Sequence, residues 1–177
     1  MQIVVEHGVE FLSIREIAKR IDYSPSGLYE YFSSKEAIID ELINEGFARL
    51  AAHIEQGVLG ETALLRLQEA GRMYMHFAVQ EPQVYLMMFN HRNAPSLSLA
   101  DIEQVTAYAQ LTRIMKDGLR SGEFHATNGA GWRELAYTSW SLMHGLSMLR
   151  LTLMNQINEN VESLNERAFQ VFLDQLK

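Results

Sequence analysis

Residues that can contact phosphate gather in one short stretch near the start of the chain. They are Ser24, Ser26, Gly27, Tyr29 and Tyr31, with Lys35 shortly after. Small hydroxyl side chains and a glycine permit close approach to a phosphate, and tyrosine hydroxyls can donate to phosphate oxygens. Lys35 adds a positive charge that a phosphate attracts. This pattern favours contact with the backbone of a nucleic acid.

Capping signals mark the helices that must position these residues. Ser13-Ile14-Arg15-Glu16 has the spacing of a capping box, and apolar residues then repeat at helical intervals up to Ile21. Ser24 followed by Pro25 restarts the chain as a cap with proline in the first helical position. This second helix is predicted to be short and to end near residue 32. Two helices joined by a tight break predict a helix-turn-helix, whose second helix lies in the major groove of DNA.

Helical periodicity accounts for most of the remaining chain, so the predicted fold class is all-α. A long helix begins after Ser33-Ser34-Lys35-Glu36 and is interrupted at Gly57 and Gly60, where a domain boundary is expected. This divides the chain into a helix-turn-helix domain, residues 1–56, and a helical domain, residues 57–177. Five helices are predicted in the second domain, at about residues 62–79, directly after Pro82, and at 99–120, 132–154 and 159–176, with a loop at 90–98 that contains Pro95.

Composition and charge exclude several classes of function. The 177 residues include no cysteine, which excludes disulfides, thiolate catalysis and cysteine-based metal sites. The net charge is −7, and residues 1–55 carry five basic and ten acidic side chains, so any contact with nucleic acid needs a local patch. No apolar run approaches the roughly 20 residues of a membrane-spanning helix, and we expect a cytoplasmic protein without a membrane partner.

Catalytic and metal-binding patterns are missing from the sequence. The six histidines are scattered over separate elements and have no metal-binding spacing. No nucleophile elbow, phosphate-binding glycine loop or dinucleotide fingerprint is present. We therefore predict no catalytic residue, no metal site and no cofactor. Methionines beside aromatic residues suit an adaptable apolar pocket as a group, although each one taken alone is better explained as a core residue.

The segments Ser13-Ile14-Arg15-Glu16-Ile17-Ala18, Tyr23-Ser24-Pro25-Ser26-Gly27-Leu28-Tyr29-Glu30-Tyr31-Phe32 and Ser34-Lys35-Glu36-Ala37 carry a family signature. They resemble the helix-turn-helix of the TetR (tetracycline-repressor) family of transcriptional regulators. The resemblance implies that Ser13, Tyr29 and Lys35 contact the DNA backbone and that Leu28 and Phe32 face inward. It implies that the positions nearest the bases are Ser24, Ser26, Gly27 and Tyr31, and Pro25 is the remaining member of the predicted DNA-binding set.

Trp140, His144 and Gly145, together with residues 81–89 and 118–124, resemble one C-terminal subgroup of that family, which has a tryptophan-histidine-glycine motif. This resemblance implies a ligand-binding and dimerisation domain, and a repressor that a small apolar or aromatic effector releases from its operator. The candidate ligand-binding residues are Met75, Tyr85, Met88, Met115, Trp140 and His144.

A homodimer built by the last two helices is also expected. Helix-turn-helix proteins bind paired half-sites, so the operator is a pseudo-palindromic double-stranded DNA and two copies of the chain must be held together. The apolar residues of 132–154 and 161–176 exceed what one core needs, and pairing two copies buries the surplus.

The match departs from the family at the beginning of the chain. The family's first helix is usually longer and more basic than the segment before Gly8, so we expect this helix to be truncated and DNA binding to be weaker than in longer relatives. Two classes of function therefore remain open. The first is a ligand-responsive DNA-binding regulator, and the second is a helical ligand-binding or interaction protein that no longer binds DNA.

Overall fold

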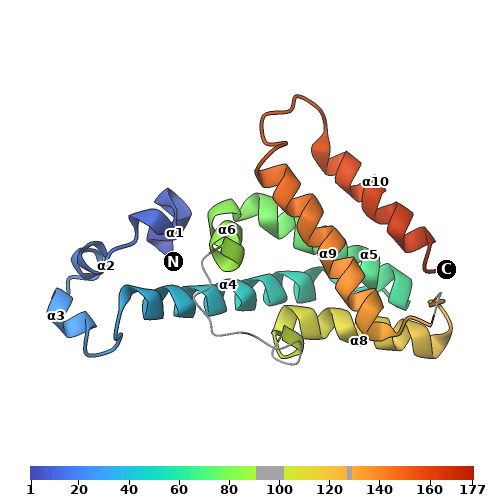
Figure 1. The fold of residues 1–177 in the computed structure, drawn as a ribbon, viewed down its shortest axis with the longest axis horizontal. Coiled ribbons are helices and arrows are strands. Elements are labelled where there is room, and N and C mark those ends of the chain that lie inside the picture. The colour runs from blue at the N-terminus through green and yellow to red at the C-terminus, as the bar shows by residue number, and fades with distance from the viewer. Residues whose placement is uncertain (91–101, 127–128) are drawn as a thin grey trace.

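The computed structural model describes residues 1–90, 102–126 and 129–177, and every regular element in those ranges is a helix (Figure 1). The predicted all-α class is therefore confirmed. The elements are α1 (Gln2–His7), the 3-10 helix η1 (Val9–Phe11), α2 (Ile14–Arg20), α3 (Pro25–Leu28), α4 (Lys35–Gly57), α5 (Ala63–Gln80), α6 (Pro82–Asn90), α8 (Thr106–Ser121), α9 (Trp132–Leu151) and α10 (Val161–Asp174).

The helices begin where the capping residues predict. Ser13 Oγ accepts from Glu16 N at 3.1 Å, and Ser34 Oγ accepts from Ala37 N at 3.1 Å. Each bond satisfies one of the donors that the first turn of a helix leaves unpaired. The reciprocal half of the box at Ser13 differs from the prediction, because the Glu16 carboxylate accepts from Arg20 Nε instead.

Some predicted helix ends shift by a few residues. α3 ends at Leu28, and residues 29–31 continue as turns rather than as helix. α9 ends at Leu151, three residues before the predicted end, where the Thr152 hydroxyl donates to Met148 O and competes with the helical bond. The predicted loop at 90–98 with Pro95, and the predicted start of a helix at residue 99, lie largely outside the described residues.

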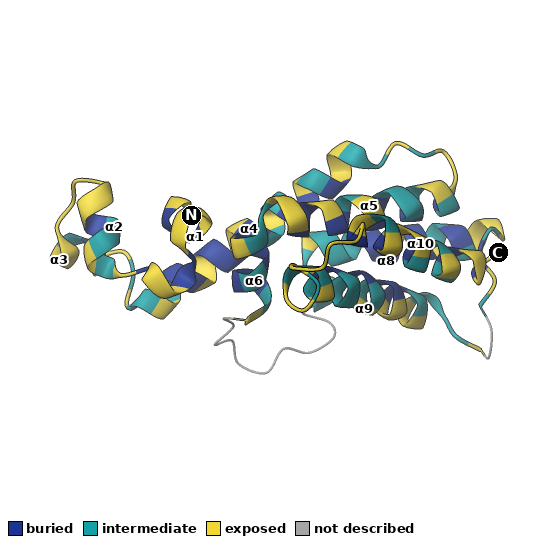
Figure 2. Ribbon diagram, turned by 90° about the horizontal axis from the view of Figure 1, so that it is seen from above, coloured by how far each residue is buried: buried dark blue, intermediate teal, exposed yellow. Residues whose placement is uncertain are grey.

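Two parts of different character are joined by α4. Figure 1 shows α2 and α3 at one end of the molecule, with α4 running from them into the bundle of α5, α6, α8, α9 and α10. Figure 2 shows exposed and intermediate residues on most of α2 and α3, while buried residues gather along α4 and inside the bundle. The first helix is tied to the bundle, because Ile3 and Val4 are buried and α1 packs on α6.

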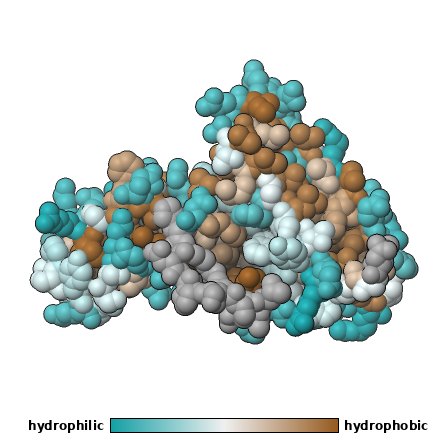
Figure 3. All heavy atoms as spheres, viewed as in Figure 1, coloured by the Kyte–Doolittle hydropathy of each residue, from teal (hydrophilic) through white to brown (hydrophobic). Residues whose placement is uncertain are grey.

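One apolar face of α9 and α10 remains open to solvent. Figure 3 shows hydrophobic atoms at the surface over these two helices. Leu164 and Val171 of α10 are exposed, and Tyr137 and Leu149 are exposed on α9. Residues 164, 168 and 171 share one side of α10, whereas Phe169 and Leu173 on the other side are buried.

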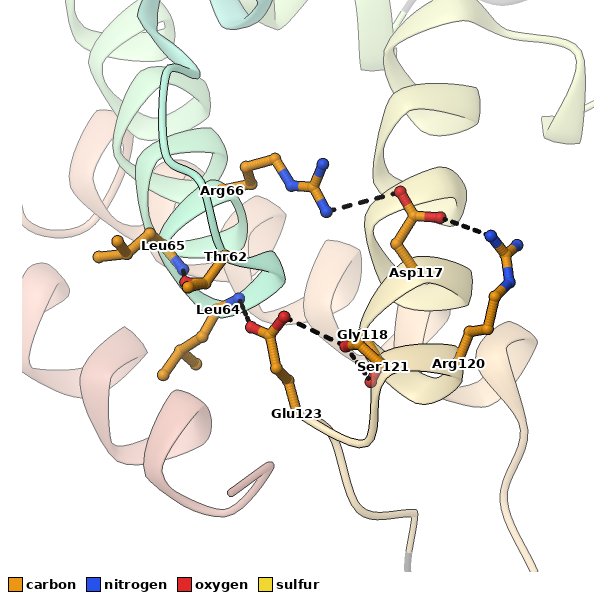
Figure 4. Close-up of polar contacts among 9 residues, drawn as sticks. All are labelled: Thr62, Leu64, Leu65, Arg66, Asp117, Gly118, Arg120, Ser121 and Glu123. Carbon is orange, nitrogen blue, oxygen red and sulfur yellow. Dashed lines mark hydrogen bonds and ion pairs between the residues drawn. The ribbon is translucent and has the colours of Figure 1, made fainter.

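The beginning of α5 is fixed to the end of α8 by polar contacts (Figure 4). The Glu123 carboxylate accepts from Leu64 N at 3.2 Å and from Ser121 Oγ at 3.1 Å. Asp117 lies 3.5 Å from Arg66 and 3.4 Å from Arg120. These bonds hold the two helices together at the end of the bundle that is far from α2 and α3.

Candidate functional site

The helix-turn-helix unit, residues 13–35, presents the predicted contact residues to solvent. Tyr29 is 56% exposed and Tyr31 is 71% exposed, and neither side chain is needed to fill the core. Ser13, Ser24, Pro25 and Ser26 are exposed as well, and Lys35 is half-buried at the first turn of α4. As predicted, Leu28 is buried and Phe32 packs against the core.

Several of these residues also have a local structural role. Ser24 Oγ caps α3 by accepting from Gly27 N at 3.0 Å, and it lies 3.1 Å from Ser26 Oγ. Gly27 lies beneath the ring of Tyr23, because a Cβ added there would come within 2.5 Å of Tyr23 Cε1. The glycine thus permits the close packing of the break against α3.

The positive charge of this unit is small. Arg20 is engaged by Glu6 at 2.8 Å and by Glu16 at 3.3 Å, so its charge is largely neutralised. Arg15 and Lys19 are exposed on the same helix and, with Lys35, supply the remaining positive charge. Three cations in the helix-turn-helix unit are enough to contact a few phosphates but too few for binding through bulk charge.

An apolar cavity of about 120 Å³ lies inside the bundle. α4 contributes Phe47, Leu50 and Ile54 to its wall, and the rest of the lining comes from α5, α6, α8, α9 and the short segment before α8. Among the candidate ligand-binding residues, Met88 and Trp140 line this cavity. Its wall is built almost wholly of carbon, which suits an apolar occupant.

Tyr74 and Trp140, which line the cavity, belong to a hydroxyl network that continues to Tyr85 and His144 behind its wall. Trp140 Nε1 donates to Tyr74 Oη at 3.3 Å, the two tyrosine oxygens lie 3.0 Å apart, and Tyr85 Oη lies 2.8 Å from His144 Nδ1. Since an indole N–H can only donate, Tyr74 Oη accepts from Trp140. The Tyr74 hydroxyl is then free to donate to Tyr85 Oη, and the Tyr85 hydroxyl donates to His144 Nδ1. This order requires a neutral His144 with its proton on Nε2.

Burial keeps every member of the network uncharged. It raises the pKa of Tyr74 to about 12 and raises the pKa of Tyr85 further. Burial also lowers the pKa of His144, which favours the neutral imidazole that the bond from Tyr85 needs. The ring of Phe89 lies 4.3 Å from that of His144, centroid to centroid.

The remaining candidate residues occupy other places. Tyr85 is fully buried and reaches the cavity only through Tyr74, Met115 is buried in the core, and Met75 lines a second pocket on the other side of α5. Tyr74 was not among the predicted ligand-binding residues, although Tyr74 lines the cavity and belongs to the hydroxyl network. Phe47, Leu50 and Ile54 of α4 also line the cavity and were not among the predicted ligand-binding residues.

The described residues contain neither a candidate metal site nor a membrane-spanning helix. No group of three or more histidine, aspartate or glutamate side chains in the described ranges is arranged to hold a metal ion. No helix in that part of the chain is long and apolar enough to cross a membrane.

An exposed helix-turn-helix on a helical bundle with an internal apolar cavity defines a ligand-responsive DNA-binding protein. Comparison with known families gives the same class. Residues 1–42 match the family described as bacterial regulatory proteins, tetR family, and residues 67–175 match the tetracyclin repressor-like C-terminal domain. The chain belongs to the TetR family. It is a DNA-binding transcriptional regulator and not an enzyme, and membership implies an operator DNA and a small-molecule effector.

The chain is also similar to individual proteins, of which the two solved structures share its fold. The uncharacterized HTH-type transcriptional regulator YobS of Bacillus subtilis (strain 168) is 25% identical over 153 residues, which is 84% of this chain and 73% of that protein. A protein of unknown function from Rhodococcus sp. RHA1 has a TM-score of 0.78 at 20% identity over 99% of this chain and 94% of that chain. The regulator FadR from Bacillus subtilis, solved in complex with stearoyl-CoA, has a TM-score of 0.75 at 17% identity, covering 99% and 95%.

Proposed function

We propose that the chain is a repressor and that a small apolar ligand in the cavity releases it from its operator. The observation that carries this proposal is the course of α4. Its first turn holds Lys35 beside the helix-turn-helix, and its later turns supply Phe47, Leu50 and Ile54 to the cavity wall. A ligand that favours one position of α4 therefore biases the position of the DNA-contacting residues, which is coupling between two sites.

The size of the cavity limits the ligand. A dry cavity of about 150 Å³ in another protein accepts benzene. The cavity here, at about 120 Å³, therefore suits a small aromatic or a short aliphatic molecule. The stearoyl-CoA that FadR binds carries a far longer chain, so an acyl chain of that length would need the helices of this chain to move apart. Tyr74 gives the ligand one hydroxyl partner.

We infer that DNA is contacted by Ser13, Ser24, Pro25, Ser26, Gly27, Tyr29, Tyr31 and Lys35. The exposure of the tyrosine hydroxyls and the place of Lys35 at the start of α4 support this set. For Ser13, Ser24 and Gly27, the capping bonds already described hold the unit in shape, so a substitution there would act on DNA binding through the fold as well.

A homodimer through α9 and α10 remains our proposal for the assembly. The open apolar side of α10, with Leu164, Ala168 and Val171, supports it, as do Tyr137 and Leu149 on α9. Two copies that meet on these faces would form a four-helix interface with two-fold symmetry. Such a pair would present two helix-turn-helix units to one pseudo-palindromic operator.

We also propose that the chain belongs to the tryptophan-histidine-glycine subgroup and that its two domains meet between residues 56 and 57. The bond of Trp140 to Tyr74 and that of His144 to Tyr85 support a shared role for the motif, because both residues join α9 to the cavity side of the bundle. The end of α4 at Gly57 supports the domain boundary, although the last turns of α4 also contribute to the cavity wall.

The test of this function measures how a ligand that fills the cavity changes the affinity for DNA. Fluorescence anisotropy with DNA from upstream of the protein's own gene, at two salt concentrations, measures specific binding. Benzene or toluene is expected to weaken it. Ala107→Leu, which adds bulk to the cavity wall, should preserve DNA binding and abolish that response, whereas Ala52→Leu on the exposed side of α4 should leave both unchanged. A response that survives Ala107→Leu would place the effector elsewhere.

The DNA contacts have a separate test. Lys35→Gln removes one positive charge, and if Lys35 contacts a phosphate the salt dependence of binding falls by about one unit of slope for each copy bound. Lys116→Gln makes the same chemical change on α8 in the bundle and is the matched control. Equal slopes for the two variants would mean that Lys35 does not contact the DNA.

A further inference from the structure

Two histidines face each other where α4 packs on α5. His53 of α4 and His76 of α5 have their Nε2 and Nδ1 atoms 3.3 Å apart, and the rings are stacked with centroids 5.5 Å apart. One of these nitrogens must donate and the other must accept, so at least one imidazole has to be neutral. The hydrogen bond between the two helices therefore depends on protonation.

The charges around His53 do not compensate a second proton on the pair. The carboxylate that acts on His53 is Glu81, at the end of α5, and it is already paired with Arg49 of α4. Partial burial and then the neighbouring His76 lower the pKa of His53, and Glu81 raises it by less. Two imidazolium ions at this separation would repel each other, and neither would have a nitrogen left to accept.

The charges around His76 balance one another. His76 is exposed and lies at the second pocket, on the side of α5 away from the apolar cavity. The charged side chains that line this pocket with it are Arg72, Arg150, Glu162 and Glu166. Two are basic and two are acidic, and one of each sign is engaged in the ion pair of Arg150 with Glu162 at 2.9 Å. These four residues therefore supply no surplus of negative charge to hold both histidines protonated.

We propose that the His53–His76 pair is a pH-sensitive latch between α4 and α5. Near neutral pH the shared hydrogen bond holds the two helices together. Below about pH 6 both imidazoles carry a charge, the bond is lost and the rings separate. Met73 of α5 packs nearby against Gly57 of α4, since a Cβ added to the glycine would clash with its sulfur. This contact should loosen when the latch opens.

The latch acts on the helix that joins the cavity to DNA, and this step rests on the proposed function. His53 lies between Leu50 and Ile54 along α4, and both of these residues line the apolar cavity. Lys35 begins the same helix. A helix released from α5 is free to leave the position that binds DNA, so acid favours the same change as the cavity ligand. By linkage, the ligand should then bind more tightly when the latch is open.

An NMR titration of the imidazoles in the full chain tests the latch without DNA. The pair should take up its two protons in separate steps, as interacting groups do. In His76→Gln, His53 should titrate in one step, because glutamine keeps an amide beside it but takes up no proton. The methyl resonance of Met73 should move with the second proton in the unaltered chain and not in His76→Gln. His125→Gln, at an exposed position after α8, is the matched control and should leave both results unchanged.

Fluorescence anisotropy at about pH 7.5 and about pH 5.5 then measures DNA binding. Acid also makes the whole chain less negative, which favours DNA, so the quantity read is the ratio of the affinity of the unaltered chain to that of His76→Gln. The loss of one hydrogen bond predicts that this ratio falls about fivefold at the lower pH for each copy bound. Benzene binding to the free protein should strengthen on acidification more in the unaltered chain than in His76→Gln.

Different results would overturn different parts of the inference. One-step titration of both histidines in the unaltered chain, or a Met73 resonance that moves equally in His76→Gln, would refute the latch. The expected NMR result with an unchanged affinity ratio for DNA would refute its coupling to α4. The expected NMR result in a chain that binds no operator at either pH would uphold the latch and count against the repressor function.

Discussion

Tyr85→Phe tests whether the hydroxyl network holds the bundle together. Tyr85 is fully buried, and its oxygen joins Tyr74 at 3.0 Å to His144 at 2.8 Å. Phenylalanine keeps the ring and its packing but removes both bonds. Tyr74 then has one remaining acceptor, His144 Nδ1 at 3.5 Å, which is at the limit of a hydrogen bond.

The expected loss is worked from those two bonds. Each net hydrogen bond contributes about 1 kcal/mol, and a weak bond from Tyr74 to His144 recovers part of it. We expect the free energy of unfolding to fall by about 2 kcal/mol, which lowers the melting temperature by roughly 4–8 °C in a chain of this size. Far-UV circular dichroism at one fixed protein concentration measures this, because a dimer melts in a concentration-dependent way.

Two comparisons make the measurement specific. Tyr31→Phe, at an exposed position of the helix-turn-helix, is the matched control and should change stability by less than about 0.5 kcal/mol. In a double-mutant cycle with Tyr74→Phe, the two losses should be non-additive, since the two hydroxyls share a bond. A Tyr85→Phe protein as stable as the original, or additive losses in the cycle, would refute the network as a source of stability.

Three further predictions concern other parts of the molecule. Burial lowers the pKa of His144 below its ordinary value of about 6.5, so the unfolded chain takes up a proton first and the free energy of unfolding falls as the pH drops below about 6.5. His144→Gln should reduce that pH dependence in urea titrations, and identical pH profiles would count against a neutral buried histidine. Gly118→Ala places a Cβ 2.2 Å from the buried ring of Phe124 and should cost about 1–3 kcal/mol, with partial rescue by Phe124→Leu; a full cost that persists with leucine would exclude the clash as its cause. Leu164→Asp places a charge on the open apolar side of α10 and should yield monomers in analytical ultracentrifugation, and a dimer as tight as that of the unaltered chain would move the interface off this face.

Local features of the fold were predictable from the sequence because the interactions behind them span a few residues. The caps at Ser13, Ser24 and Ser34 each join a side chain to a backbone amide three residues away, so the residue types alone indicate where α2, α3 and α4 begin. The family signature adds the inward direction of Leu28, which the structure confirms.

Which side chains meet inside the bundle could not be predicted in the same way. The hydroxyl network joins positions that lie 11 to 70 residues apart, and the pairing depends on how α5, α6 and α9 pack. Tyr74 and Met75 are neighbours on α5, yet one lines the apolar cavity and the other the second pocket, because successive residues of a helix point in different directions. A list of apolar residues at helical spacing therefore mixes residues that line different pockets.

The length of α4 has a mechanical consequence. From Leu50 at the cavity to Lys35 at the first turn, the helix covers about 22 Å at 1.5 Å per residue. A rigid rod of that length, tilted by about 5° at the cavity, carries its far end about 2 Å sideways. Hydrogen bonds tolerate only a few tenths of an ångström in length, so a displacement of 2 Å breaks them. In the proposed repressor, α4 would therefore convert a small change in the filling of the cavity into a displacement of Lys35 that is large enough to break its proposed contact with DNA.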